Sequence, residues 1–314
     1  MHSGINNNCI PSELTIKAPA TTANMGPGYD CAGAALELYS YFTFRRLKNH
    51  YNKVYYEVEG CDDRFCNEDN LCIRSFKRAL SEIGSDEFSI KLIIDAGVPV
   101  SRGLGSSSTC IVAGVLAANI FTGSKLSREE CLKICNDIEG HPDNVAPCLM
   151  GGMVISFLEN DKIHTVNYDI NSCFRFIAII PDYEVSTQEA RKAVKKDIDI
   201  SQAVYSVSHA CAFYKALVDG DEGLCRISCR DVLHEPYRRQ LIPDYDIVRD
   251  IALNNGACAF CISGSGSTML AVVKSEPDSL KIKKITENIH SVFPLFSIIE
   301  LGICKNGAET INIK

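Results

Sequence analysis

The sequence has no run of about 18 consecutive apolar residues, which argues against a helix that spans a membrane. It also has no surplus of positive charge, because 32 Lys and Arg residues stand against 39 Asp and Glu residues, for a formal net charge of -7. This balance predicts no nucleic-acid partner and no binding to an anionic membrane surface. Residues 1–11 are polar and Asn-rich and lack the charged and apolar regions of a signal peptide. We therefore expect residues 1–12 to be a disordered segment.

Cysteine is abundant, with 16 residues, yet the pattern of a disulfide or zinc protein is missing. The chain has no export signal, and its 314 residues far exceed a small secreted disulfide scaffold. Cys258-x-x-Cys261 has no second Cys-x-x-Cys to complete a zinc site, and its side chains would point to opposite faces of a strand. Cys225 and Cys229 are spaced to share a helix face. We expect reduced cysteines that serve as small core residues in a reducing cytoplasm; metal or redox chemistry is the alternative.

A Gly/Ser loop lies between a predicted strand, 89–94, and a predicted helix of small apolar residues, 110–121. Gly103 and Gly105 let the backbone approach a ligand, and the first N–H groups of a helix bind anions. The hydroxyls of residues 106–108 would add donors to a phosphate. The loop lacks Gly-Lys-Ser/Thr and so is not a Walker loop. An ordinary Ser N-cap is the alternative, but the three serines and the small-residue helix favour phosphate binding.

The remaining sequence mixes strands and helices without strict β-α-β alternation, which predicts an α+β fold. Strands are expected at 14–18, 39–47, 54–58, 89–94, 151–158, 162–166, 174–180, 257–262, 269–273 and 297–301. Helices are expected at 71–83, 110–121, 127–138, 187–194, 200–218, 221–231, 244–254 and 280–293, with a capping box of Ser127 and Glu130 on the third. Residues 19–30 and 139–147 are expected to be loops, and 167–172 a domain boundary.

Four further stretches carry unusual polar residues. They are 19–30, with Asn24 and Asp30; 139–144, with Glu139, His141, Asp143 and Asn144; 185–191 together with 234–239, with Arg191 and Arg238; and the glycine turn 262–268. Asn24 and Asp30 could bind an ammonium or hydroxyl group, or form a structural turn. Glu139 could hold Mg²⁺ near a phosphate, or belong to a solvated loop in which a proline starts a short helix. The arginines could clamp a carboxylate or form surface salt bridges, and the glycine turn could close over a ligand or be a plain β-turn.

In this order the stretches resemble the GHMP kinases, the galacto-, homoserine, mevalonate and phosphomevalonate kinases. The loop 99–109 is similar to their central Pro-x-x-x-Gly-Leu-Gly-Ser-Ser motif, and 262–268 to their third motif. Within the family, 18–30 is similar to the opening motif of the homoserine kinases. His-Pro-Asp-Asn-Val-Ala-Pro at 141–147 resembles their second signature, and the resemblance covers roughly residues 14–302. After the paired serines of the motif many relatives have alanine, whereas this chain has Ser108 and Thr109; both are small, and we expect no loss of function from this.

The resemblance implies a fold and a reaction. The fold has an N-terminal ATP-binding domain like domain 2 of ribosomal protein S5, at 13–168, and a ferredoxin-like C-terminal domain at 169–314. The reaction transfers phosphate from ATP to the side-chain hydroxyl of L-homoserine, giving ADP and O-phospho-L-homoserine on the way to threonine, with Mg²⁺ bound. Because homoserine is a zwitterion, Asp30 suits its ammonium group and the two arginines suit its carboxylate.

The resemblance also implies roles for individual residues. For the nucleotide these are Asn70 near the base and Pro99, Arg102, Gly103, Leu104, Gly105, Ser106, Ser107, Ser108 and Thr109 around the phosphates. For Mg²⁺ they are the Ser107 hydroxyl and Glu139. For homoserine they are Asn24, Asp30, His141, Asn144, Thr187, Arg191 and Arg238.

The sequence leaves open which group accepts the proton of the substrate hydroxyl. The mevalonate kinases are proposed to use an aspartate base, whereas this chain, like the homoserine kinases, offers Asn144 in that region. Without a base, the hydroxyl would attack the γ-phosphate directly and its proton would leave to phosphate or water. The neighbouring Asp143 is the alternative as base, and His141 is the third catalytic candidate.

Two other functions compete with this interpretation. The first is another GHMP small-molecule kinase, which the combination of two arginines with Asp30 argues against, because a purely anionic substrate has little use for a carboxylate. The second is a non-catalytic regulator that binds ATP or a metabolite, which Glu139 and the intact serine loop argue against. The oligomeric state is left open, with a homodimer as one option.

Overall fold

The computed structural model describes residues 11–48 and 53–314, so most of the predicted disordered segment 1–12 lies outside the described residues. Strands are β1 (Glu13–Ala23), β2 (Ala32–Arg46), β3 (Tyr56–Glu59), β4 (Ile90–Asp95), β5 (Met153–Glu159), β6 (Lys162–Tyr168), β7 (Phe174–Ile180), β8 (Ala259–Ile262), β9 (Met269–Lys274), β10 (Ser297–Leu301) and β11 (Glu309–Ile313). Helices are α1 (Leu71–Ile83), α2 (Ser106–Phe121), α3 (Arg128–Glu139), α4 (Pro142–Met150), α5 (Thr187–Ala193), α6 (Ile200–Asp219), α7 (Glu222–Ser228), α8 (Glu235–Arg238), α9 (Tyr245–Asn254) and α10 (Leu280–Val292), with short 3₁₀ turns η1 (Asp63–Phe65) and η2 (Arg239–Leu241).

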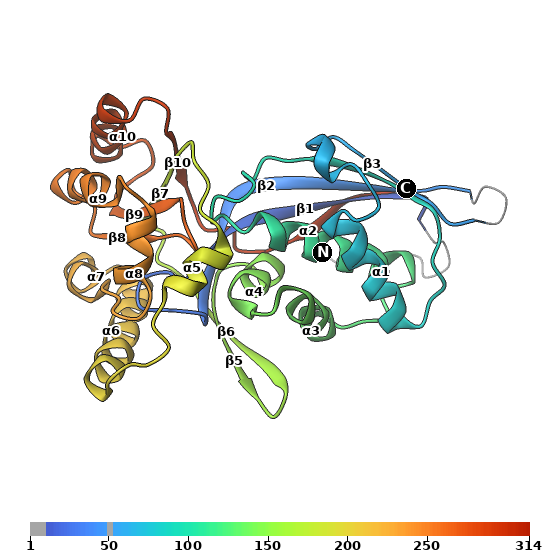
Figure 1. The fold of residues 1–314 in the computed structure, drawn as a ribbon, viewed down its shortest axis with the longest axis horizontal. Coiled ribbons are helices and arrows are strands. Elements are labelled where there is room, and N and C mark those ends of the chain that lie inside the picture. Colours follow the sequence, from blue (N-terminus) through green and yellow to red (C-terminus); the bar gives the residue numbers. More distant parts are fainter. Residues whose placement is uncertain (1–10, 49–52) are drawn as a thin grey trace.

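The first sheet forms the larger half of the molecule and is covered by α1 to α4 (Figure 1). Its strand order is β11-β1-β2-β4-β3, and the β5–β6 hairpin branches from β2. Neighbours are antiparallel except for the parallel pair β3 and β4. The hairpin projects away from the body of the molecule (Figure 1). The sheet therefore presents one face to α1 to α4, and of these helices α2 begins at the Gly/Ser loop.

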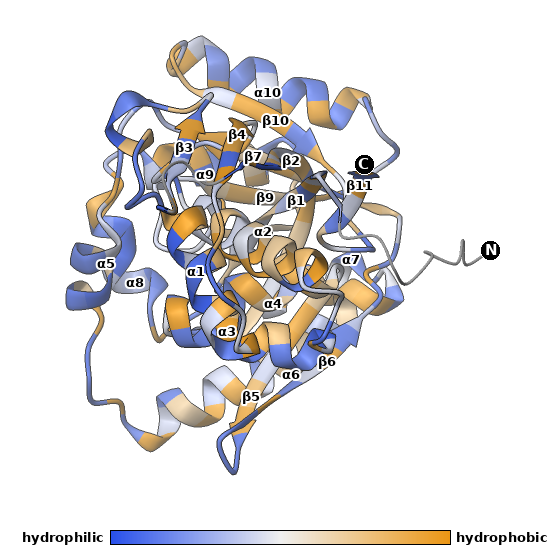
Figure 2. Cartoon of the chain, turned by 90° about the vertical axis from the view of Figure 1, so that its right-hand side faces the viewer, coloured by the Kyte–Doolittle hydropathy of each residue, from blue (hydrophilic) through white to orange (hydrophobic). Residues whose placement is uncertain are grey.

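Helix α2 is the centre of this half. It is apolar on all sides, as a fully enclosed helix must be, and most of its residues are buried. It packs against α1, α3, α4 and β1 in one core that includes Phe42, Phe76 and Phe121. Figure 2 shows α2 and α4 in apolar colours inside the molecule and α5 in hydrophilic blue at its edge. Because the core holds α2 firmly, the loop at its N-terminus has a fixed position.

The second sheet has the antiparallel order β10-β7-β9-β8 and is buried on both faces. Along β7, Phe174 and Phe176 face the core shared with α6 and the end of the first sheet, whereas Ile177 and Ile179 face the core under α9 and α10. This two-sided burial explains why the strand reads as an almost continuous apolar run. No helix among the described residues is long and apolar enough to cross a membrane.

Most predicted elements are present, and the differences have local causes. Helix α2 begins at Ser106 instead of residue 110, because Gly105 adopts a left-handed backbone, with φ of 69°, and serves as N-cap. The expected loop 139–147 is wrong, since α4 begins at Pro142 there. The capping box of Ser127 and Glu130 is confirmed.

Strand β1 continues from the predicted 14–18 to Ala23, where the loop 19–30 was expected. No strand was expected at the position of β11, which pairs with β1 and returns the end of the chain to the first sheet. The predicted division at residue 168 falls between β6 and β7 and stays a prediction; β11 lies beyond it in sequence but belongs to the first sheet.

Candidate active site

One cavity gathers nearly all of the residues that the motifs single out. It is lined by Asn24, Asp30, Asn70, Arg102, Gly103, Gly105, Ser106, Ser107, Thr109, Glu139, His141, Asp143, Asn144, Thr187, Arg191 and Arg238. Three predicted nucleotide residues do not line it: Pro99, Leu104 and Ser108. Leu104 is 1% exposed and belongs to the core next to the second sheet. The serine loop thus alternates between residues that face the cavity and residues that anchor the loop.

Both glycines of the loop are required by backbone shape and by space. Gly103 and Gly105 have φ of 75° and 69°, in the region that favours glycine. A Cβ on Gly103 would stand 2.3 Å from the Ser263 carbonyl oxygen, and one on Gly105 would stand 1.9 Å from the Thr21 hydroxyl oxygen. The loop is therefore pressed against β1 and the glycine turn 263–267. Its free side is the cavity, where the first N–H groups of α2 lie at the positive end of the helix dipole.

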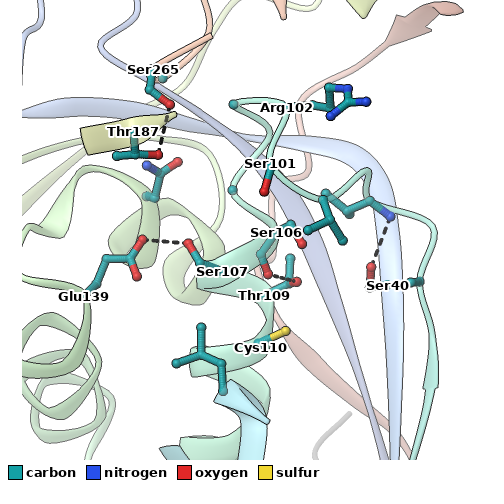
Figure 3. Close-up of a pocket in the computed structure, with 18 of the residues that line it drawn as sticks. Ser40, Ser101, Arg102, Ser106, Ser107, Thr109, Cys110, Glu139, Thr187 and Ser265 are labelled. Carbon is teal, nitrogen blue, oxygen red and sulfur yellow. Dashed lines mark hydrogen bonds between the residues drawn. The ribbon is translucent and has the colours of Figure 1, made fainter. Parts of the chain in front are cut away.

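Glu139, the last residue of α3, faces the serines across the cavity (Figure 3). Its Oε1 accepts a hydrogen bond from the Ser107 hydroxyl at 2.8 Å and from the Ser108 hydroxyl at 3.3 Å. Ser108 is fully buried, so its contact anchors the carboxylate to α2. Ser107 lines the cavity, so its hydroxyl and the Glu139 carboxylate form one exposed pair of oxygen ligands beside the phosphate-binding loop.

Asn144 lies in the first turn of α4, which positions it next to the Gly/Ser loop. Its Oδ1 accepts a hydrogen bond from the Thr21 hydroxyl at 2.7 Å. Because its oxygen is held in this way, the amide nitrogen is the group left to donate into the cavity, and it has no partner among the residues that the structure describes. The sequence did not single out Thr21, whose hydroxyl orients Asn144.

His141 and Asp143 form a close pair at the start of α4. The His141 Nδ1 and the Asp143 Oδ1 are in direct contact, and the Asp143 side chain is only 1% exposed. Burial alone would lower the pKa of His141, but the hydrogen bond and charge of Asp143 outweigh this and raise it above its ordinary value. One oxygen of the Asp143 carboxylate is therefore already bound to the imidazole.

The far end of the cavity carries the charged pair expected for a zwitterion. Arg191 Nη1 on α5 lies 3.7 Å from Asp30 Oδ2. Arg238 is 2% exposed, donates to the Gly264 carbonyl at 3.0 Å and to the Ala190 carbonyl at 3.3 Å, and its burial lowers its pKa. Its guanidinium also lies 5.0 Å from the centre of the Tyr29 ring. Arg191 is thus the exposed arginine of the two and Arg238 the fixed one.

Several predicted residues line the cavity, but their polar atoms form hydrogen bonds with other residues of the protein. Asn24 donates to the Gly264 carbonyl and accepts from the Asp30 N–H, at 3.2 and 2.8 Å, so it positions Asp30. Asn70 caps α1, accepting from the Cys72 N–H and donating to the Phe65 carbonyl, both at 2.9 Å. Thr187 and Ser265 are joined through their hydroxyls at 3.3 Å (Figure 3).

Arg102 points away from the serines in Figure 3. It donates to the Pro181 and Asp182 carbonyls at 3.2 and 3.1 Å and pairs with Glu184 at 3.0 Å. These contacts tie the Gly/Ser loop to the end of β7. Arg102 therefore links the loop that follows the first sheet to a strand of the second sheet.

The cavity has an apolar wall that the sequence did not predict. It is formed by Phe42, Cys61, Phe65, Leu71, Ile94, Ala96, Val98, Val100 and Cys110, next to the cap residue Asn70. These residues come from β2, the segment around η1, the start of α1, β4, the loop after β4, and α2. Apolar side chains from separate strands carry no motif, so only the folded chain shows that they meet. Such a wall suits a flat heteroaromatic group at the end of the cavity away from Arg191 and Arg238.

Comparisons with known proteins agree with this geometry. Residues 70–152 match the model of the GHMP kinase N-terminal domain, and residues 214–288 match the GHMP kinase C-terminal model. A homoserine kinase of Clostridium beijerinckii is 41% identical over 299 residues, which cover 95% of this chain and 98% of the relative. A homoserine kinase of Clostridium botulinum (strain Eklund 17B / Type B) is 38% identical over 302 residues, which cover 95% of this chain and 98% of the relative.

Solved structures give the same result. The homoserine kinase of Cytophaga hutchinsonii superimposes with a TM-score of 0.86 at 29% identity, covering 98% of this chain and all of that one. The mevalonate kinase of L. major, solved with R-mevalonate, shares the fold, with a TM-score of 0.73 at 14% identity, covering 96% of this chain and 99% of that one.

The chain therefore belongs to the GHMP kinase family, on the branch of the homoserine kinases. The predicted family, two-domain α+β fold and kinase activity are confirmed by these matches.

Proposed function

We propose that this cavity phosphorylates the side-chain hydroxyl of L-homoserine with ATP, in the cytoplasm and as a step toward threonine. The observation that supports this most directly is the arrangement of charge in one cavity. The Gly/Ser loop with Ser107 and Glu139 lines the same cavity as Asp30, Arg191 and Arg238. The first set suits a polyphosphate and the second suits an amino-acid zwitterion.

The nucleotide would lie along the loop, with its phosphates on the first N–H groups of α2 and its base against the apolar wall. The Ser106 and Thr109 side chains line this end of the cavity. The Thr109 hydroxyl donates to the Ser106 carbonyl at 2.8 Å, which leaves Ser106 as the more available hydroxyl. Asn70 would hold the segment around Phe65 in place instead of contacting the base, because both of its polar groups are used in capping α1.

Mg²⁺ fits the Glu139 and Ser107 pair. The ion prefers one or two carboxylates together with phosphate oxygens and waters, so a single exposed carboxylate near the phosphates is enough. No cluster of three or more His, Cys, Asp or Glu side chains within residues 11–48 and 53–314 is arranged to hold a metal by itself. When bound, the ion would neutralise charge on the transferred phosphoryl group.

The chain's own residues would then orient the acceptor. Arg191 and Arg238 would hold the homoserine carboxylate, Asp30 its ammonium group, and the Asn144 amide its hydroxyl oxygen. That oxygen forms the new bond to the γ-phosphorus while the bond to the bridging oxygen breaks and ADP leaves. The proton would pass to phosphate or water, because the Asp143 carboxylate already binds His141.

A coupled ADP-release assay with homoserine, mevalonate, galactose and shikimate tests the proposed substrate. Homoserine is expected to be the strongly preferred acceptor, since only it offers both an ammonium and a carboxylate group to the charged end of the cavity. A higher kcat/KM for mevalonate would favour the interpretation that this chain is a different GHMP small-molecule kinase. ADP release with none of the acceptors would favour a regulator that binds ATP without catalysis.

Replacing either arginine by Ala is expected to raise the homoserine KM much more than the ATP KM. Each arginine would supply a charge-assisted contact, and losing one costs about 1.5–3 kcal/mol. This corresponds to roughly a 10- to 150-fold change in KM. Initial-rate kinetics with each substrate varied in turn give the two constants.

Lys192→Ala is the matched control, because Lys192 is an exposed cation next to Arg191 on the same helix. Arg238→Lys guards against misfolding, since it keeps the buried charge while losing the bidentate geometry. Equal increases in both KM values would show that the arginines do not form the carboxylate clamp.

A further inference from the structure

Tyr29 is the one aromatic residue of the opening motif 18–30, and the proposed function gives it no role. Its side chain is half-buried and does not line the active-site cavity. It directly precedes Asp30 in the chain, and the guanidinium of Arg238 lies over its ring, 5.0 Å from the ring centre. Tyr29 is therefore next to two of the three residues proposed to bind the charged groups of homoserine.

The backbone that carries Tyr29 is held from two sides. A Cβ on Gly28 would stand 1.9 Å from the Tyr214 hydroxyl oxygen, so this segment lies directly against α6. Asp30 has a left-handed backbone, with φ of 54°, which aspartate adopts more readily than most residues. The Asn24 Oδ1 accepts the Asp30 N–H at 2.8 Å and holds this conformation. The side chain of Tyr29 thus starts from a fixed position.

The ring of Tyr29 packs against the side of α8 that carries His234 and Arg238, two residues one helical turn apart. The His234 imidazole is fully buried and stacks on the ring, with ring centres 5.3 Å apart and planes at 21°. Arg238 also donates to the Ala190 and Gly264 carbonyls. The ring adds a contact of a different kind to these two hydrogen bonds, because an aromatic face attracts a guanidinium.

The hydroxyl of Tyr29 interacts with the carboxylate of Asp30. Burial raises the pKa of Tyr29, and the negative charge of Asp30 and a hydrogen bond to its side chain raise it further. The phenol therefore keeps its proton at neutral pH, and since a carboxylate can only accept, Tyr29 is the donor. Arg191 Nη1 stands 3.7 Å from Asp30 Oδ2, beyond hydrogen-bond distance, so that ion pair orients the carboxylate only loosely.

We propose that Tyr29 is a positioning residue that sets the spacing between the Asp30 carboxylate and the Arg238 guanidinium, and so makes the site selective for an acceptor with both an ammonium and a carboxylate group. In an α-amino acid these two groups are attached to one carbon atom, so their partners must stand at one separation. A tyrosine side chain suits this task, because it is a rigid body with two rotatable bonds. This inference deepens the proposed function and rests on it.

Two partial substrates separate the two contacts. 4-Hydroxybutanoate is homoserine without the ammonium group, and 3-aminopropan-1-ol is homoserine without the carboxylate. Their inhibition constants against homoserine are measured on the full chain, together with the KM values of homoserine and ATP. Tyr29→Phe keeps the ring and removes the hydroxyl, so we expect the homoserine KM and the 3-aminopropan-1-ol constant to rise about three- to tenfold. The 4-hydroxybutanoate constant and the ATP KM should stay nearly unchanged.

Two further variants complete the test. Tyr29→Leu also removes the ring beside Arg238, so the 4-hydroxybutanoate constant should now rise as well. Tyr237→Phe is the matched control, because Tyr237 is the neighbour of Arg238 on α8 and does not line the active-site cavity. Removal of its hydroxyl should leave all four constants unchanged. Circular dichroism checks that each variant is folded.

The assignment is overturned if folded Tyr29→Phe leaves the homoserine KM unchanged, or if it raises all four constants equally, as a general loosening of the site would. It is also overturned if folded Tyr29→Leu leaves the 4-hydroxybutanoate constant unchanged. An unmodified chain that does not phosphorylate homoserine would overturn the proposed function and this assignment together. Homoserine turnover that is insensitive to Tyr29→Phe would overturn this assignment alone.

Discussion

Glu139→Gln is expected to lower kcat/KM by about two to three orders of magnitude, the range seen when one preorganised electrostatic contact to a transition state is lost. The amide keeps an oxygen that can accept the Ser107 hydroxyl, so the fold should survive, but it carries no negative charge to hold Mg²⁺. The residual activity should therefore need much more Mg²⁺. Initial rates measured across a Mg²⁺ titration at fixed ATP give both quantities.

Glu129→Gln is the matched control for this experiment. Glu129 is exposed in the first turn of the same helix, α3, and does not line the cavity. It should leave both kcat/KM and the Mg²⁺ requirement unchanged. Full activity of Glu139→Gln at low Mg²⁺ would remove Glu139 from the metal site.

Asn144→Ala is expected to reduce the single-turnover rate by about a hundredfold, because the attacking hydroxyl loses the group that aligns it. Asp143→Asn is expected to reduce the rate by less than about tenfold, below the usual contribution of a general base. The structure supplies the reason for the difference. The Asp143 carboxylate is bound to His141 and buried, whereas the Asn144 amide nitrogen is free to face the substrate.

Both variants are compared at saturating ATP and homoserine, with circular dichroism to confirm folding. Thr21→Val serves as a second test of Asn144, because it removes the hydroxyl that fixes the amide while leaving the amide in place. A drop of about a thousandfold in folded Asp143→Asn would identify Asp143 as the base. An unchanged rate for Asn144→Ala would exclude the amide from orienting the hydroxyl.

Local sequence signals predicted the secondary structure well wherever one element carried its own pattern. Helix α1 and strand β7 have the bounds that their apolar periodicity and flanking turns indicate. Elements that depend on distant partners were missed. Strand β11 is a short polar stretch that becomes a strand because β1 offers it an edge. Helix α4 was expected only in the alternative interpretation, in which a proline starts a short helix, because prolines are typical of loops although one is compatible with the first turn of a helix.

In the active site, too, features with a local sequence signal were predictable and features that depend on distant contacts were not. Motif residues such as Gly105 and Arg238 were predictable because a fixed backbone shape or a charge needs that residue type. The structural roles of Asn24, Asn70 and Arg102 were not predictable from the sequence. The sequence does not show whether an amide or guanidinium group binds a ligand or another part of the protein. The apolar wall depends on contacts between distant segments, which no single stretch encodes.

The pairing of β11 with β1 bears on how the chain folds while it is being made. The backbone N–H of Ser12 donates to the Lys314 carbonyl, two residues 302 positions apart. During synthesis the outer edge of β1 therefore stays open until nearly the whole sequence described here has left the ribosome, and an open strand edge can pair with another chain. The same proximity of the two strands makes a circular permutant, joined by a short linker from β11 to β1 and opened in the β5–β6 turn, a natural way to close that edge early.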